Sequence, residues 1–268
     1  MRPLQISSAA NQTIKDLVRL KDRKGDRAQQ AFVVEGLREI QRAIASGFKI
    51  EDLYYCHDFL SADGRQIVDN SGARHLAEVT PQVFAKIALR DASDGLVAVL
   101  KSRVVNLSDL KFKDDKNGAF LLVAENIEKP GNLGALLRTA DAVGADGVIA
   151  LGRSVDPWNQ NCIRASLGGV FSVGVVSCEV DEFFDFAESR SIQTIAAALS
   201  PTSIDAFNAD LTGSIALILG SEAFGLSDKV LSRVSSQVVL PMRGVCDSLN
   251  VSVAGGVLAY EVLRRRLI

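Results

Sequence analysis

The sequence predicts an α/β protein with two domains, the second of which contains a mostly parallel sheet. Short apolar runs alternate with segments of helical periodicity along the 268-residue chain. Beyond residue 118 these runs are apolar at nearly every position, which is typical of parallel strands buried on both faces. A polar stretch rich in Lys and Asp at 106–117 predicts a linker between one domain at 1–105 and another at 118–268.

The first half of the chain predicts a compact α/β unit. A helix is expected from about residue 8 to 22, because apolar residues recur there at helical spacing behind the candidate N-caps Ser7 and Ser8. A second helix stops at Gly47, and helical stretches separate the strands that follow; the second of these stretches opens with Thr80 as cap and Pro81 in its first turn. The strands expected in this half are 31–34, 53–56, 75–79 and 96–100.

In the second half, strands and helices alternate strictly. The helix that follows the first strand opens near Gly131, and the last helix runs from about Ser248 to Arg266. Three arginines close this last helix and suit the negative end of its dipole. The strands expected in this half are 120–124, 147–151, 173–176, 192–197, 215–219 and 238–240.

The composition excludes several classes of protein. The four cysteines are scattered and form no Cys-x-x-Cys pair, which argues against a disulfide framework and a zinc site. No apolar run approaches the roughly 18 residues of a membrane span, and the N-terminus lacks the apolar core of a signal peptide. Gly220 and Gly225 have the glycine spacing of a P-loop without its Lys. A cytoplasmic protein without a membrane segment is therefore expected.

Basic residues are concentrated near the N-terminus, although the net charge of the chain is only −2. Seven Lys and Arg residues stand against three Asp between Arg2 and Arg27. Such a run is commonly a solvated helix end, and a patch that contacts phosphates is the alternative. The charges alone leave both interpretations open.

Polar side chains follow three of the predicted strands, within turns that are rich in Gly, Pro and Ser. Ligands of open α/β sheets bind beyond the carboxyl ends of the strands, so these side chains are candidates for one functional site. The five candidates are Asn132, Arg138, Glu222, Ser248 and Asn250.

Three sequence blocks around these residues resemble the motifs of the SpoU/TrmH family of SPOUT RNA methyltransferases. The first block is NLGALLRTA at 132–140, and the second is LGSEAFGL at 219–226. The third is LPMRG at 240–244, continued by SLNVSVA at 248–254. The resemblance in order and spacing covers 118–268. The preceding part of the chain resembles the small ribosomal-protein-L30e-like RNA-binding domain of this family.

The resemblance implies S-adenosylmethionine as cofactor, methylation of a ribose 2′-hydroxyl and a deep trefoil knot in the second domain. It implies no metal. The cofactor would bind among the turns after the last strands, and Gly220 would lack a side chain because the cofactor occupies that space. The residues expected to contact the cofactor are Leu199, Gly220, Leu240, Met242 and Leu249.

The resemblance also assigns roles to the five polar candidates. Arg138 is expected to stabilise the developing alkoxide or to grip the adjacent phosphate, because a guanidinium with a pKa above about 12 is a poor general base. Asn132 and Glu222 would orient Arg138, while Ser248 and Asn250 would position the substrate.

The family further implies a homodimer formed through the knotted domain and RNA as the partner of the N-terminal domain. Ribosomal RNA is favoured over transfer RNA, because the N-terminal domain is present and no long basic tail follows Ile268. A transfer RNA 2′-O-methyltransferase, a methyltransferase acting on a base nitrogen and a non-catalytic RNA-binding homologue are the alternatives. The residues expected to contact RNA are Lys15, Arg19, Lys21, Arg23 and Lys24.

Overall fold

The computed structural model describes residues 3–22, 31–90, 93–103, 105–112 and 116–267. By their internal contacts, the residues form two units. The first unit, here the N-terminal unit, comprises 1–103 together with Trp158–Ser172. The second, the C-terminal unit, comprises 104–157 together with 173–268. The chain thus leaves the C-terminal unit after Pro157 and returns to it at Val173.

The N-terminal unit contains a five-stranded mixed sheet in the order β1-β4-β3-β5-β2. β5 runs antiparallel to both of its neighbours, whereas β4 is parallel to both β1 and β3. The four strands predicted for this half are present, and β1 is a short additional strand that pairs at the edge. The strands are β1 (Leu4–Ile6), β2 (Ala31–Glu35), β3 (Ile50–Tyr55), β4 (His75–Val79) and β5 (Leu96–Lys101).

Four helices of the first hundred residues cover this sheet: α1 (Gln12–Asp22), α2 (Leu37–Ala45), α3 (Ala62–Asn70) and α4 (Pro81–Ile87). Helix α1 begins later than the expected start near residue 8. Asn11 provides the cap, because its Oδ1 accepts a hydrogen bond from the backbone N–H of Thr13 at 2.9 Å. The apolar face of α1, including Ile14 and Leu17, packs into the core of this unit.

The segment Trp158–Ser172 packs on the N-terminal unit through aromatic rings. It contains α6 (Gln160–Ala165) and a 3₁₀ turn at Gly169–Phe171. Trp158 stacks on Phe32 with 4.6 Å between the ring centroids, and Phe171 meets Phe48 edge-on at 5.3 Å. Aromatic pairs in these geometries add stability beyond the apolar area they bury.

The C-terminal unit contains a seven-stranded sheet in the order β10-β12-β9-β11-β6-β7-β8. Within the described residues, every pairing of neighbouring strands in this sheet is parallel. The six predicted strands are present and confirm the fold class; β10 is a further two-residue strand at the edge. The strands are β6 (Phe120–Glu125), β7 (Gly147–Leu151), β8 (Gly174–Cys178), β9 (Gln193–Ala197), β10 (Ile204–Asp205), β11 (Ile215–Leu219) and β12 (Ser236–Val239).

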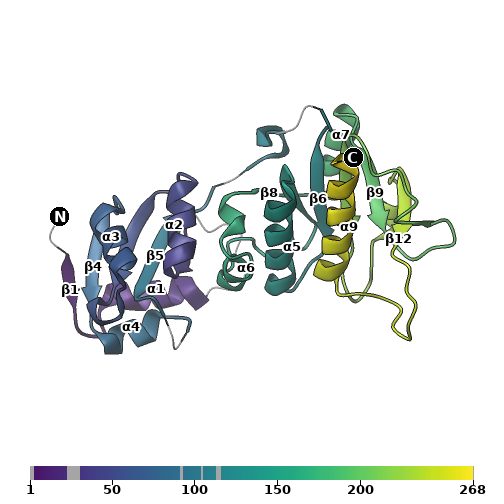
Figure 1. Cartoon of the computed structure of the whole chain (residues 1–268). Coiled ribbons are helices and arrows are strands. Elements are labelled where there is room, and N and C mark those ends of the chain that lie inside the picture. The colour runs from purple at the N-terminus through teal and green to yellow at the C-terminus, as the bar shows by residue number, and fades with distance from the viewer. Residues whose placement is uncertain (1–2, 23–30, 91–92, 104, 113–115, 268) are drawn as a thin grey trace. The chain divides into compact units, whose positions relative to one another are not determined.

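Helices cover both faces of this sheet. On one face, α5 (Pro130–Val143) and α9 (Val251–Arg266) lie side by side (Figure 1). On the other, α7 (Val180–Ser189) and α8 (Asp228–Leu231) pack against the central strands. Gly255 lets α9 approach closely, because a Cβ there would lie 2.5 Å from the Leu136 side chain and 2.7 Å from that of Leu219.

The three arginines at the end of α9 make specific contacts besides facing the helix dipole. Arg264 and Arg265 both donate hydrogen bonds to the buried carboxylate of Glu261, each at 2.8 Å. Arg266 donates to the backbone carbonyls of Gly118 and Ala119, at 3.1 and 2.9 Å. The end of the helix is thereby fixed to the start of β6. No helix in the described part of the chain is long and apolar enough to cross a membrane.

Candidate active site

Two cavities open beyond the carboxyl ends of the parallel strands of the C-terminal unit. The first cavity, of about 590 Å³, is lined by 126–129 at the end of β6, by Asn132 and Arg153, and by 221–227 after β11. The second cavity, of about 450 Å³, lies among the ends of β9, β11 and β12 and the start of α9. Residues 221, 222 and 225 line both cavities. The two cavities therefore share a wall.

The residues predicted to contact the cofactor all line the second cavity. They are Leu199 after β9, Gly220 after β11, Leu240 and Met242 after β12, and Leu249 before α9. The leucines and Met242 make the wall largely apolar, while the surrounding turns offer backbone N–H and C=O groups. Such a wall can hold a flat heteroaromatic group and hydrogen-bond its edge.

The reason expected for Gly220 is wrong. A Cβ at this position would lie 2.5 Å from the carbonyl oxygen of Gly225 and 2.5 Å from the backbone nitrogen of Leu226. The loop folds back tightly here, because Ser221 and Gly225 exchange two backbone hydrogen bonds of 3.0 Å each. The space that a side chain would need is thus occupied by the chain's own backbone. The residue still lines the cavity.

Three of the five polar candidates meet in one hydrogen-bonded cluster. The carboxylate of Glu222 accepts a hydrogen bond from Asn132 Nδ2 at 2.9 Å and another from Asn250 Nδ2. Asn250 Nδ2 also donates to Asn132 Oδ1 at 3.2 Å. These residues come from three separate elements: α5, the loop after β11 and the cap of α9.

The start of α9 fixes the orientation of the Asn250 amide. As the N-cap of α9, Asn250 accepts hydrogen bonds through Oδ1 from the backbone N–H of Ser252 at 3.0 Å and from its hydroxyl at 2.6 Å. Because Oδ1 is used in this way, Nδ2 faces Glu222. The side chain that begins the helix therefore also holds the cluster.

Lys129 is a member of the cluster that the sequence analysis missed. Its ammonium forms an ion pair with Glu222, and this hydrogen bond is the main cause that lowers the pKa of Glu222, followed by the one from Asn132. Glu222 is therefore an ionised acceptor that orients donors around it. The only sequence signal for Lys129 is its place directly before Pro130, which opens α5.

Ser248 and Arg138 lie apart from this cluster. Ser248 lines the second cavity and donates to Asp247 at 3.2 Å. Arg138 is exposed on α5, about 9 Å along the helix from Asn132 at 1.5 Å per residue. It lines neither cavity. Within the described residues, its guanidinium makes no hydrogen bond or ion pair, so the expected orientation by Asn132 and Glu222 does not occur in the single chain.

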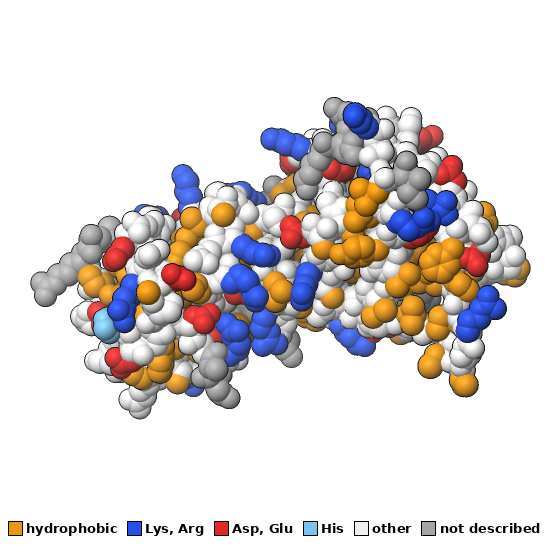
Figure 2. Space-filling model, in the orientation of Figure 1, with side chains coloured by type: hydrophobic (Ala, Val, Ile, Leu, Met, Phe, Trp, Pro, Cys, Tyr) orange, Lys and Arg blue, Asp and Glu red, His pale blue; other side chains and the backbone are white. Residues whose placement is uncertain are grey.

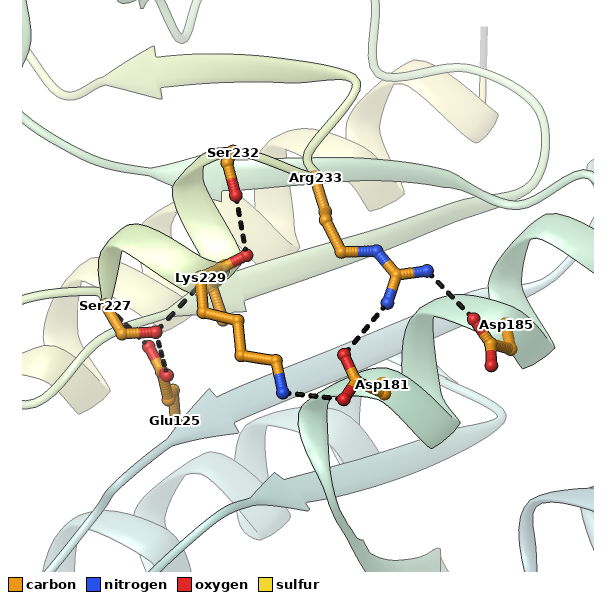
Figure 3. A network of polar contacts seen from close by, with 8 residues as sticks. Glu125, Asp181, Asp185, Ser227, Lys229, Ser232 and Arg233 are labelled. Carbon is orange, nitrogen blue, oxygen red and sulfur yellow. Dashed lines mark hydrogen bonds and ion pairs between the residues drawn. The ribbon is translucent and has the colours of Figure 1, made fainter.

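A buried carboxylate anchors the loop that carries Glu222. Glu125, at the end of β6 and only 2% exposed, accepts hydrogen bonds from the backbone N–H of Ser227 at 2.8 Å and from its hydroxyl at 2.6 Å (Figure 3). Ser227 in turn caps α8. In the sequence, the signal for this anchor is a carboxylate at the last position of an otherwise apolar strand.

Ion pairs on the other side of α8 join it to α7. Lys229 contacts Asp181 at 2.7 Å, and Arg233 contacts Asp181 at 3.3 Å and Asp185 at 2.9 Å (Figure 3). These pairs are solvent-exposed, so each contributes little to stability. The residues of α8 line neither cavity.

The basic residues predicted to contact RNA have different structural environments. Lys15 and Arg19 are exposed on α1, and Arg19 pairs with Asp16 at 3.4 Å. Lys21 instead donates to the backbone carbonyls of Lys86 and Ala88 at the end of α4, at 3.3 and 3.2 Å. The remaining two, Arg23 and Lys24, lie outside the described residues.

Known families match both parts of the chain. A model of the SpoU rRNA Methylase family matches residues 119–260, and the MRM3-like substrate binding domain matches residues 11–98. The 23S rRNA (uridine(2479)-2′-O)-methyltransferase of Streptomyces viridochromogenes is 28% identical over 243 residues, which are 88% of this chain and 83% of that protein.

Solved structures resemble the chain over nearly its whole length. The crystal structure of an AdoMet-bound rRNA methyltransferase from Sinorhizobium meliloti is 28% identical, covers 98% of each chain and has a TM-score of 0.87. The crystal structure of an RNA 2′-O ribose methyltransferase is 36% identical, covers 99% of this chain and 100% of its own, and has a TM-score of 0.82. The family match spans more than half of the sequence and confirms the resemblance, and the chain belongs to the SpoU rRNA methylase family.

Proposed function

We propose that this protein is an S-adenosylmethionine-dependent methyltransferase that modifies a ribose 2′-hydroxyl in ribosomal RNA. One observation carries the proposal: a largely apolar cavity at the carboxyl edge of a parallel sheet shares a wall with the Asn132–Glu222–Asn250 cluster. The rRNA 2′-O-methyltransferase from Streptomyces viridochromogenes matches most of the chain and supports the choice of ribosomal RNA.

The second cavity fits this cofactor. Its volume of about 450 Å³ lies within the usual range for small-molecule sites. Leu199, Leu240 and Leu249 would enclose the adenine, and the backbone of the surrounding turns would hydrogen-bond its edge. When bound, S-adenosylmethionine supplies an electrophilic methyl group.

The chain's own task is then to hold and activate the ribose hydroxyl. Ionised Glu222 fixes the amides of Asn132 and Asn250 at the wall between the two cavities. Ser248, inside the second cavity, would position the substrate. The reaction also needs a cation that stabilises the developing alkoxide. We propose that the guanidinium of Arg138 is this cation.

A homodimer would explain where Arg138 acts. Val253, Val257 and Tyr260 form an apolar stripe along α9 and are 50%, 38% and 54% exposed. Figure 2 shows hydrophobic side chains gathered over the face on which α9 lies. We propose that this stripe pairs two subunits, so that Arg138 on the adjacent helix α5 serves a site completed by the partner.

The N-terminal unit is proposed to bind the RNA, with Lys15 and Arg19 on the exposed side of α1 as contacts to phosphates. In this proposal, 1–105 is the substrate-binding domain and 118–268 is the catalytic domain, except that 158–172 packs with the N-terminal unit. The protein is proposed to act in the cytoplasm.

Mapping of 2′-O-methyl groups tests the proposed function. A strain that lacks the gene should lose one modification in ribosomal RNA, and the wild-type gene should restore it. The Arg138→Ala variant should not, because loss of one transition-state contact lowers kcat by about 10²–10³-fold. A lost site in transfer RNA would change the substrate, and unchanged ribose methylation in both RNAs would refute the proposal. Sedimentation of the protein as a monomer would refute the dimer.

A further inference from the structure

The loop between Ser221 and Gly225 presents an aromatic ring to solvent. Phe224 is 90% exposed and lines the first cavity. The ring stands on a tight turn, since Ser221 and Gly225 exchange two backbone hydrogen bonds and Ser221 Oγ accepts a third from the backbone N–H of Phe224 at 3.1 Å. Gly225 completes the turn with a φ of +67°. The backbone under Phe224 is therefore well defined although its side chain packs on little of the chain.

The other side chains of the first cavity have chemistry that suits a nucleic acid. Arg153 follows β7 and is exposed, and its guanidinium makes no hydrogen bond or ion pair with the part of the chain described here. Lys129 lines the same cavity and forms an ion pair with Glu222. An exposed aromatic face and an uncommitted guanidinium in one cavity suit a base and its phosphate, respectively.

We propose that Phe224 is a platform on which one base of the RNA acceptor strand stacks, and that Arg153 contacts a neighbouring backbone phosphate. This inference rests on the proposed function. A second observation supports it: Ser221, Glu222 and Gly225 line both cavities. A nucleotide bound in the first cavity would therefore lie against the wall of the cofactor cavity. Single-stranded RNA is commonly held in this way, by stacking on aromatic rings.

Steady-state methyl transfer to ribosomal RNA from the deletion strain tests the platform. Phe224→Ala should raise the KM for RNA by about 5- to 140-fold, the effect of losing one base–aromatic stack, while kcat changes less. Phe224→Tyr should stay within about twofold of wild type, because the aromatic face remains. The affinity for S-adenosylmethionine without RNA, measured by calorimetry, should be the same in all variants.

Phe207→Ala is the matched control. Phe207 is 47% exposed in the same unit and lines neither cavity, so its loss should leave the KM for RNA unchanged. The Arg153→Gln variant should weaken RNA binding and reduce the slope of log affinity against log salt concentration by about one, because one phosphate contact is lost.

Tryptophan fluorescence reports the stack directly. Phe224→Trp adds an indole to a chain whose single native tryptophan is Trp158, so the wild-type protein provides the baseline. Addition of the same ribosomal RNA should quench the added emission.

Three results would overturn this inference while leaving the function intact: a wild-type KM in active Phe224→Ala, no quenching in Phe224→Trp, or loss of the dimer in Phe224→Ala. A wild-type protein that transfers no methyl group to any RNA would instead refute the proposed function.

Discussion

Glu222 shows how single residues set the chemistry of the candidate site. It is an ionised carboxylate that three neighbours hold: the ammonium of Lys129 and the amides of Asn132 and Asn250. The hydrogen bond from Lys129 makes the largest contribution to its lowered pKa. The charge state of this acceptor thus depends on a residue outside the three sequence blocks.

The pH profile of activity should reveal this dependence. In Lys129→Met, the pKa of Glu222 should rise towards its usual range, because the main interaction with its ionised form is lost. The acid limb of kcat/KM against pH should then move to higher pH. Lys229→Met removes a comparable exposed ion pair, with Asp181, and should leave the profile unchanged. An acid limb in the same place in both variants would mean that Lys129 does not set this charge.

Two glycines of the C-terminal unit should respond to the same substitution in opposite ways. Gly220→Ala should destabilise the protein by about 1–3 kcal/mol, because a Cβ would overlap the backbone of Gly225 and Leu226. Gly131→Ala adds its methyl group to open space in the first turn of α5 and should stabilise by about 0.4–1 kcal/mol. Urea denaturation measures both effects. Equal stability of the two variants would contradict the role assigned to the tight loop.

At the scale of elements, agreement with the sequence follows the strength of the local pattern. Strands β6, β7 and β11 are apolar at almost every position, and a run of that kind has few other stable environments. Strands β1 and β10, with three and two residues, are too short for a periodic pattern and exist because a neighbouring strand pairs with them. Helix α1 is capped by Asn11, which accepts from the backbone N–H of Thr13, whereas the hydroxyl of the expected cap Ser8 accepts from Ala10 in the turn before the helix.

The candidate site was predictable only in part, for a related reason. Asn132, Glu222 and Asn250 stand in recognisable blocks near turns after predicted strands, so the sequence placed them at one edge of the sheet. Lys129 and Arg153 were not found, because a lone cation in a turn carries no signal until folding places it in a cavity.

Helix α9 should make stability sensitive to acid. Hydrogen bonds from Arg264, and then from Arg265, lower the pKa of buried Glu261 to about 2. An acid whose pKa is lowered by folding contributes stability above its unfolded pKa, and this stability is lost as the pH falls through the folded value. Stability should therefore decrease from about pH 4.5 to about pH 2, and the decrease should be smaller in Glu261→Gln. Glu188→Gln, on the exposed end of α7, is the control in thermal melts across this range.

At the scale of the whole molecule, the N-terminal unit includes residues from two distant parts of the sequence. Phe32 and Phe48, at 5% and 8% exposure, are covered by Trp158 and Phe171. The local sequence does not indicate that 158–172 belongs to a different unit from the strands before and after it. The family match at 119–260 likewise includes this segment without a break.

A fragment that ends at Arg103 should therefore be poorly folded. It would expose Phe32 and Phe48, and it should bind a hydrophobic dye and melt at a lower temperature than a fragment to which 158–172 is joined by a Gly/Ser linker. The matched control is the same linked fragment with Trp158→Ala and Phe171→Ala, which should behave like the shorter fragment. Equal melting temperatures for all three would show that the segment is not needed.

Because 158–172 belongs to the N-terminal unit, it also limits how the two regions of such proteins can be exchanged between relatives. Since the chain passes between the two units after 103, after 157 and after 172, no single cut in the gene separates one unit from the other. A chimera that receives a foreign N-terminal region also needs the matching aromatic segment inside its methyltransferase region. A change in the N-terminal unit therefore also requires a matching change in 158–172, which lies within the sequence of the methyltransferase region. The two regions are thus expected to be inherited together.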